Sequence, residues 1–318
     1  MVDATPRACP LCRGNRRRVV LDVAGRGPTG RTYSLVQCMD CTLRYTIPVP
    51  TVEEFERLYS SDYYVSGDAC VRTPDFARVL LQRSILNRNR TALLGRSPGR
   101  VLDVGCGNGE FLLYLKQRGW LAYGTDVSAA ACELARRKGI EVRMGELRSA
   151  RYPGRFFDVV MLSHVLEHVL DPPDELAEVR RVLADDGILV VQVPNSDSWT
   201  FRLCRSAWYP LDVPRHLQHF TPRTLELVLT RAGFSSARRW NFHHWDFTYI
   251  VYSFLRWIGA AQRYGIETFS RDFASASLRS KLAFACAAAV ATPVAMLYSV
   301  LSVALTGNGE TLTVTARR

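Results

Sequence analysis

The stretch VLDVGCGNGEF, at residues 101–111, constrains the fold more than any other part of this chain. An apolar run that ends in an acid, Asp103, leads directly into three glycines at alternate positions. Glycines in such a loop permit a sharp turn and let main-chain N–H groups approach a ligand at the start of a helix. The dinucleotide fingerprint G-x-G-x-x-G would place its third glycine where this chain has Glu110. The spacing therefore favours a nucleoside ligand without a pyrophosphate.

Strand-like and helix-like segments alternate from residue 100 to residue 193. The runs RVLDV, LAYGTD, FFDVVML and ILVVQVP are typical of strands, and GEFLLYLKQRG and SAAACELARRKG are typical of helices. This alternation predicts an α/β fold with a doubly wound, mostly parallel sheet. In such a sheet ligands bind beyond the carboxyl ends of the strands, at the switch point beside the first strand. The second predicted strand ends at Asp126, where a carboxylate can bind both hydroxyls of a ribose.

Four ordered motifs, VLDVGCGNGEF, GTDVS, FFDVVMLSHVLEHVLDP and RVLADDGILVVQVPN, resemble those of class I S-adenosylmethionine-dependent methyltransferases. The resemblance covers about residues 100–234 and extends to the broad group that includes the ubiquinone-biosynthesis O-methyltransferases. It implies a Rossmann-like fold and S-adenosylmethionine as cofactor. The glycine loop would surround the methionine part, Asp126 would bind the ribose, and Glu146 and Leu147 would flank the adenine. The implied cofactor-binding residues are Asp103, Gly105, Cys106, Gly107, Gly109, Asp126, Val127, Glu146, Leu147 and Ser163.

A hydroxyl acceptor needs a general base, and histidine titrates in the useful range. His164 and His168 lie in the sequence HVLEH, at the end of the fourth predicted strand and on the following turn. Being four apart, they would share one face if this stretch were helical. The ubiquinone relatives have Glu-Val-x-Glu-His here and bind a divalent ion through its acids. In this chain His164 replaces the first acid and leaves Glu167, which puts metal-assisted catalysis in doubt. His168 either takes part in catalysis or satisfies a backbone carbonyl.

A second histidine-containing stretch, YPLDVPRHLQHFTPRTL, follows the fifth predicted strand, where acceptors enter in this fold. We expect His216 to act as base or substrate ligand, with His164 and His168 as the other catalytic candidates. Arg215 would meet a phosphate, and His219 would be a contact beside the next helix. Because similar proteins act on sugars and on lipid- or nucleotide-linked glycans, the expected acceptor is a hydroxyl or activated carbon of a small or lipid-linked, sugar-containing molecule.

Two CxxC pairs near the amino terminus indicate a metal site. Four thiolates on two turns form a tetrahedral cage suited to a structural zinc ion, and the alternating sequence between the pairs is typical of a small β-ribbon. The less favoured interpretation is four unrelated buried thiols. Nine cysteines without a recognisable signal peptide indicate a reducing, cytoplasmic location. The predicted zinc ligands are Cys9, Cys12, Cys38 and Cys41.

Residues 282–305 contain no charged side chain. We expect residues 247–306 to form a helical hairpin that docks on the cytoplasmic face of a membrane, where the net charge of +11 favours anionic lipid. The alternative is that these helices pack against the rest of the domain or a second subunit. The predicted segments are a zinc ribbon at 1–46, a helical connector or lid at 47–99, the S-adenosylmethionine-binding core at 100–246, the apolar insert at 247–306 and the last strand of the sheet at 307–318.

Two other functions are compatible with parts of the sequence. Methylation of ribosomal RNA would suit the basic charge and the zinc ribbon. Against it, CMDC lacks the histidine usual in the second knuckle of such relatives, and the apolar insert suits no RNA surface, so nucleic acid is not the expected partner. A non-catalytic module that presents the ribbon to a partner is the other possibility, and the intact glycine loop with Asp126 argues against it. The sequence leaves the identity of the acceptor and the oligomeric state open.

Overall fold

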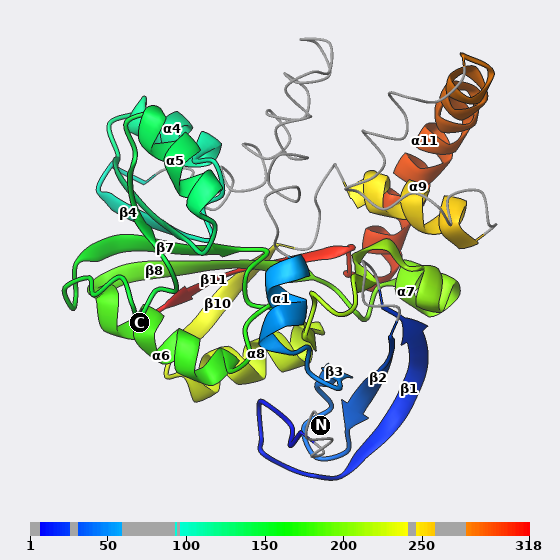
Figure 1. Cartoon of the computed structure of the whole chain (residues 1–318), viewed down its shortest axis with the longest axis horizontal. Coiled ribbons are helices and arrows are strands. Elements are labelled where there is room, and N and C mark those ends of the chain that lie inside the picture. The colour runs from blue at the N-terminus through cyan, green and yellow to red at the C-terminus, as the bar shows by residue number, and fades with distance from the viewer. Residues whose placement is uncertain (1–6, 26–30, 59–92, 94–95, 241–245, 258–277) are drawn as a thin grey trace.

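The computed structural model describes residues 7–25, 31–58, 93, 96–240, 246–257 and 278–318. Its main element is a seven-stranded sheet with the order β10-β11-β8-β7-β4-β5-β6 (Figure 1). Strands β4 to β8 run parallel, and β11 is antiparallel to both of its neighbours. This confirms the predicted α/β fold with a mostly parallel, doubly wound sheet. The strands are β4 (Arg100–Val104), β5 (Leu121–Asp126), β6 (Glu141–Met144), β7 (Phe157–Ser163), β8 (Leu183–Pro194), β10 (Ser235–Trp240) and β11 (Thr311–Arg317).

Helices cover both faces of this sheet because its central strands are apolar on both sides. On β7, Val159 and Met161 belong to one buried cluster, and the alternate residues Val160 and Leu162 belong to the other. The period of two along a strand sends alternate side chains to opposite faces. The covering helices are α4 (Glu110–Lys116) and α5 (Ala129–Arg137) on the first face and α6 (Pro172–Val182) and α8 (Pro222–Arg231) on the second. β4, the first strand of this sheet along the chain, lies between β5 and β7.

The apolar insert lies between two neighbouring strands of the sheet. β10 leads into α9 (Asp246–Trp257), and α11 (Leu278–Thr306) leads back into β11; residues 258–277 lie outside the described part of the chain. The two helices pack on one another through Ile250, Leu255 and Ala295. Figure 1 shows α11 running outward from the sheet, past α9. Among the described residues, no helix combines the length and the apolar character needed to cross a membrane.

The amino-terminal ribbon is joined to the core by a shared sheet. Strands β1 (Arg17–Ala24), β2 (Thr32–Cys38) and β3 (Arg44–Ile47) are antiparallel, and β3 pairs in turn with β9 (Gln218–His219) from the core. Buried ribbon residues such as Leu43 also belong to the same apolar cluster as Phe220. The ribbon is thus packed into the main domain.

A short helix, α1 (Val52–Leu58), follows the ribbon. It begins with a capping box, in which the Glu54 N–H donates to the Thr51 hydroxyl and the Thr51 N–H donates to the Glu54 carboxylate. The second predicted helix of the connector lies outside the described residues, as do most of the residues between α1 and β4.

Candidate active site

The three glycines between β4 and α4 all have a left-handed backbone, with φ values of 70°, 55° and 75°. A side chain at Gly105 would meet Val165 at 2.6 Å, and one at Gly109 would meet Ala135 at 2.9 Å. At Gly107, by contrast, no described atom lies within 4 Å of the place a Cβ would occupy. Packing of the protein on itself therefore requires two of the glycines, and the loop is open for a ligand at Gly107.

Asp126, at the end of β5, is bonded directly to this loop. Its carboxylate accepts hydrogen bonds from the N–H groups of Gly107 and Ser128, each at 2.8 Å, and its side chain is buried. The sequence predicted a carboxylate that binds a ribose. The structure adds a second task, which is to fix the glycine loop against the end of β5. A ribose would use the lone pairs that these two bonds leave.

Asp103, the first acid of the opening motif, is buried, and its Oδ1 has no hydrogen-bond partner among the described residues. Burial, together with the nearby charge of Asp126, raises the pKa of Asp103 to about 7. A buried polar atom without a partner is costly, so the site calls for a donor or a cation from outside the chain. The amino group of the methionine part of S-adenosylmethionine has this character, and the residues present therefore fit this cofactor.

The predicted adenine side lies next to Asp126, because the N–H of Gly145 donates to the Asp126 carbonyl at 2.8 Å. Val127 and Glu146 are exposed there, as an adenine contact requires. Leu147 differs from the prediction: its side chain is completely buried in the main core. Only the main chain of Leu147 is therefore available to an adenine.

The side chains of the two remaining predicted cofactor residues, Cys106 and Ser163, contact other residues of the protein. The thiol of Cys106 is buried beside Gly124, where an added Cβ would lie 2.6 Å from its sulfur. The hydroxyl of Ser163, at the end of β7, donates to the side chain of Gln192 on β8 at 3.1 Å. Both residues therefore help to shape the carboxyl ends of the central strands.

Residues 164–168 follow β7 as a turn, as the sequence predicts, and not as a helix, so His164 and His168 do not share a helix face. The backbone of His164 is left-handed, with φ 56°, which breaks any helix at that point. Its Nδ1 lies 3.0 Å from the carboxylate of Glu167, which is almost completely buried. Because Val165 packs on Gly105, this turn lies directly against the cofactor loop.

His216 joins the same turn from a loop far along the chain. The rings of His168 and His216 meet edge to face with centroids 4.7 Å apart. Their Nδ1 atoms donate to backbone carbonyls, that of His168 to Arg215 at 3.1 Å and that of His216 to Pro210 at 2.7 Å. His168 thus satisfies a backbone carbonyl and also contacts the second histidine. One ligand atom each from Glu167, His168 and His216 lies within 4.8 Å of the other two, and such donors also suit a divalent cation.

The electrostatics of this cluster follow from its burial. Burial alone would raise the pKa of Glu167, but the hydrogen bond with His164 and the neighbouring imidazoles lower it to about 2. Burial, reinforced by the neighbouring His168, lowers the pKa of His216 to about 4. At neutral pH the cluster therefore holds an ionised carboxylate beside a neutral His216 imidazole.

Two further residues of this loop, Arg215 and His219, are held within the protein, and for Arg215 this differs from the prediction. Arg215 is buried, and its guanidinium donates to the Leu58 carbonyl at 3.2 Å and to Asp212 at 3.3 Å, so it does not present itself to a phosphate. His219 is buried against the ribbon, with Nε2 3.0 Å from the hydroxyl of Thr46. Sequence reasoning missed the part played by Thr46, since nothing in a ribbon strand signals a contact with a loop about 170 residues away.

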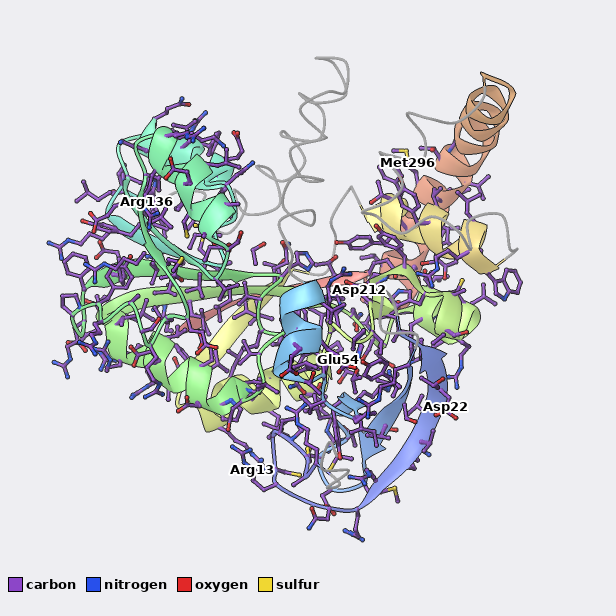
Figure 2. The ribbon with its side chains drawn as sticks, in the orientation of Figure 1. Arg13, Asp22, Glu54, Arg136, Asp212 and Met296 are labelled. Atoms are coloured by element: carbon purple, nitrogen blue, oxygen red, sulfur yellow. The ribbon has the colours of Figure 1, made fainter. Side chains whose placement is uncertain are left out.

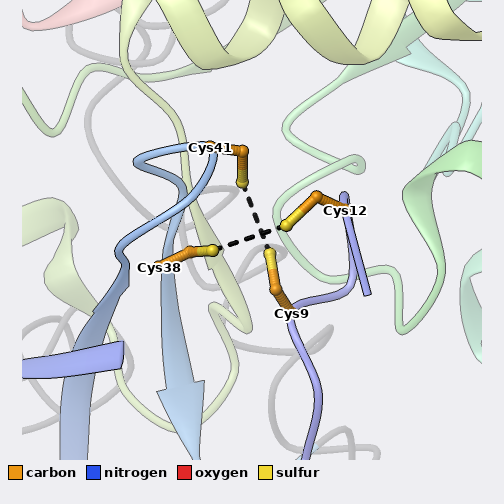
Figure 3. A group of neighbouring side chains, drawn as sticks. All are labelled: Cys9, Cys12, Cys38 and Cys41. Atoms are coloured by element: carbon orange, nitrogen blue, oxygen red, sulfur yellow. Dashed lines mark hydrogen bonds between the residues drawn. The ribbon is translucent and has the colours of Figure 1, made fainter. Parts of the chain in front are cut away.

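The four predicted zinc ligands come together between two turns of the ribbon (Figure 3). The sulfurs of Cys9 and Cys41 are 3.5 Å apart and those of Cys12 and Cys38 are 3.4 Å apart, and none of the four is in a disulfide. All four sulfurs lie within 4.8 Å of one another. A tetrahedral zinc with bonds of about 2.3 Å needs sulfurs about 3.8 Å apart, so the cage fits the ion with a small expansion.

Comparison with known proteins identifies the family. A model described as a methyltransferase domain matches residues 77–237, which are 161 of the 318 residues. An uncharacterised protein of transposon TN4556 from Streptomyces fradiae is 36% identical over 117 residues, which are 34% of this chain and only 34% of that protein. The trans-aconitate 2-methyltransferase of Mycobacterium sp. (strain KMS) is 31% identical over 186 residues, 52% of this chain and 70% of that enzyme. A crystal structure of an S-adenosylmethionine-dependent methyltransferase from Archaeoglobus fulgidus has a TM-score of 0.49 at 19% identity and covers 80% of this chain and 100% of that chain.

The family match includes the glycine loop, Asp126 and the turn that carries Glu167. These are the elements that the fold brings to the carboxyl ends of β4, β5 and β7. The chain belongs to the class I S-adenosylmethionine-dependent methyltransferases.

Proposed function

We propose that this protein transfers a methyl group to a hydroxyl or activated carbon of a small or lipid-linked, sugar-containing acceptor. The observation that carries the proposal is the cluster of Glu167, His168 and His216. Glu167 and His216 are buried and His168 is partly buried. The cluster contains a neutral imidazole beside a carboxylate, and it lies against the cofactor loop through the contact of Val165 with Gly105. Such a cluster has the groups that a proton-removing acceptor site needs.

S-adenosylmethionine supplies an activated methyl group when bound, and the protein has to align the acceptor and remove a proton. Alignment of the reacting groups contributes about 7–11 kcal/mol in well-oriented systems. We assign proton removal to His216. Its Nδ1–H is held by the Pro210 carbonyl, so the lone pair of the neutral ring is on Nε2. The ionised Glu167, with an oxygen within 4.8 Å of a His216 ring nitrogen, would stabilise the imidazolium that forms.

We further propose that the cage of Cys9, Cys12, Cys38 and Cys41 holds a structural zinc ion. Four thiolates leave no open position on a tetrahedral metal, so the ion would take no part in the chemistry. The support is the approach of the four sulfurs and their place in the common core. In this role zinc would hold the ribbon in the shape that lets β3 pair with β9.

The decisive experiment is to incubate the protein with cofactor labelled in the methyl group and with lipid, glycan and RNA fractions of cells. Label in the lipid or glycan fraction, lost in a His216→Ala variant that still binds cofactor, is the expected result. Label in RNA would instead favour nucleic-acid methylation. Absence of label from every fraction, with cofactor bound normally, would contradict the proposed acceptor class.

A further inference from the structure

In the described part of α11, large apolar side chains are exposed and small ones are buried, which is the reverse of a helix that faces water. Its buried residues are small: Ala295, Ser299 and Ser302. On the opposite stripe Val294, Leu297 and Leu305 are 65%, 61% and 70% exposed. A helix on the surface of a water-soluble protein buries its large apolar side chains. Helices in lipid do the reverse, with small residues at the helix contact and large aliphatic ones outside.

α9, which packs on α11, adds a further exposed large apolar side chain, that of Trp257. We call this set of exposed side chains the α9–α11 surface and define it by Trp257, Val294, Leu297, Val300, Leu301 and Leu305. Figure 2 labels Met296, another exposed residue of α11, near the place where this helix passes α9. Every exposed residue among residues 292–306 is apolar. Exposed tryptophan is typical of the boundary between a bilayer and water.

Positive charge accompanies this surface. Exposed Arg202 of α7 (Trp199–Cys204) and Arg205 of the following 3-10 turn η2 (Arg205–Ala207) flank the exposed Leu203, and both elements contact α9. Arg202 pairs with Asp197 at 2.8 Å, so Arg205 carries the uncompensated charge of the two. The sequence has no acidic residue from position 273 to 309, and the whole chain carries +11. Anionic headgroups complement such a charge distribution.

α9, the helix that carries Trp257, also contacts the loop that carries His216. The N–H of Tyr209, in the 3-10 turn η3 (Tyr209–Leu211), donates to the hydroxyl of Ser253 on α9 at 2.9 Å. The ring of Tyr209 stacks on that of Tyr252 with centroids 5.0 Å apart. The next residue, Pro210, accepts the Nδ1–H of His216. Two consecutive hydrogen-bonded contacts therefore connect the α9–α11 surface to the proposed base.

We propose that the α9–α11 surface binds the surface of an anionic lipid bilayer, and that this contact orders the His216 loop through Ser253 and Tyr209. The second part rests on the proposed function, because it assigns His216 to the acceptor site. β10 and β11, which flank the insert, pair within one sheet, so both ends of the insert stay on the same side of the membrane. An acceptor with a lipid anchor would then be presented to the site from the membrane plane.

Vesicle flotation tests the surface without cofactor or acceptor. The probe is phosphatidylcholine vesicles with and without phosphatidylglycerol, and the variant replaces Leu297, Leu301 and Leu305 by Gln. The matched control is Leu121→Gln, an equally exposed leucine at the start of β5. We expect wild type and control to float with anionic vesicles, and the triple variant to bind at least about tenfold more weakly because it presents less apolar area. Equal flotation of all three, or no flotation of wild type, would overturn the proposal.

A second copy of the chain is the competing occupant, and sedimentation distinguishes it. Self-association of the wild type that the triple variant abolishes, without vesicle binding, would assign the surface to a dimer and refute the lipid proposal. Flotation without methyl transfer to any acceptor would leave the lipid surface intact and refute the proposed function instead.

Hydrogen exchange tests the connection to His216. Anionic vesicles should slow deuterium uptake in residues 207–217 of the wild type. The Ser253→Ala variant should still float but lose this protection, since the N–H of Tyr209 then has no hydroxyl to bind. Unchanged uptake in the wild type on vesicle binding would disprove the coupling while leaving the lipid surface standing.

Discussion

The hydroxyl of Thr46 donates to the carbonyl oxygen of His216 at 2.8 Å. Thr46 belongs to the amino-terminal ribbon and His216 to the proposed acceptor site, so the ribbon forms part of the wall behind that site. The N–H of Thr46 also donates to the Leu217 carbonyl at 3.0 Å. These bonds make the ribbon a support (a brace) for the acceptor loop. They disfavour the idea that the ribbon is a separate module presented to a partner.

Thr46→Val should lower turnover by about ten- to a hundredfold, because a small displacement of a catalytic group has effects of this size. The change removes the hydroxyl that His216 and His219 share, and leaves the volume of the side chain nearly the same. Cofactor affinity and metal content should not change. Steady-state kinetics, calorimetry and metal analysis check this, with Thr32→Val, an exposed threonine of β2, as control. Normal turnover in the Thr46 variant would show that the brace is unimportant.

Metal analysis should find one zinc per chain in the wild type, and none in Cys38→Ser. The matched control is Cys132→Ser, a buried cysteine of α5 outside the cage, which should keep its zinc. Loss of the ion should also destabilise the β3–β9 pairing, so turnover should fall in the Cys38 variant. Equal zinc in the two variants would mean that the cage is misassigned. A second metal in the wild type would point to Glu167, His168 and His216.

Asp126→Ala should weaken cofactor binding by about 1–3 kcal/mol, the range for lost charged hydrogen bonds. Calorimetry measures this directly, and Asp186→Ala, at an exposed carboxylate, is the control. Because Asp126 also accepts from Gly107 and Ser128, the free energy of unfolding without cofactor should fall too. Absence of cofactor binding to well-folded wild type would rule out the enzyme assignment.

The sequence predicts the cofactor side well because that side is local. The glycine loop joins consecutive elements, and Asp126 ends the strand next to β4, so strand order alone brings them together. Leu147 shows the limit of this reasoning, since periodicity does not say which residue of a short loop turns into the core. The positive φ of His164 likewise cannot be inferred from helical spacing.

The acceptor side was harder to predict because it depends on distant contacts. Glu167 and His216 are brought together by main-chain bonds in which Leu217 and Gln218 donate to the Glu167 carbonyl. Gln218 and its neighbour His219 form β9, which also pairs with the ribbon strand β3, so distant parts of the chain meet here. Similarly, the sequence identified an apolar run at residues 282–305 but not which of its faces is exposed, since small and large residues alternate there without a clear period.

His216→Ala should lower turnover by about 10²- to 10⁴-fold, the usual contribution of a general base, with cofactor affinity unchanged. His168→Ala should have a smaller, mixed effect, because His168 holds the Arg215 carbonyl and supports the His216 ring without occupying its place. Rapid-quench measurements with the acceptor found by labelling separate the chemical step from binding. Near-normal turnover in the His216 variant would move the base elsewhere, with His164 the next candidate.

Ionisation of the Asp103 carboxyl group should make both the stability of the fold and the affinity for the cofactor depend on pH. Its pKa of about 7 in the fold lies above the ordinary value of 3.8. The neutral acid is therefore favoured by folding, and this stabilisation is fully present below pH 3.8 and is lost as the pH rises through about 7. The loss without cofactor is of the order of 4 kcal/mol, at 1.36 kcal/mol for each pKa unit. Ionisation should have the opposite effect on binding, since the carboxylate attracts the cationic amino group of the cofactor.

Asp103→Asn separates the two effects, because the amide keeps the shape and cannot ionise. Without cofactor the variant should be more stable than wild type at about pH 8, where wild-type Asp103 must ionise in a buried place, and similar to it near pH 4. Cofactor affinity of the wild type should rise as the pH increases through about 7, and that of the variant should stay low and flat. Chemical unfolding and calorimetry over this range are the measurements. A wild-type affinity that falls with rising pH would show that Asp103 does not meet the amino group of the cofactor.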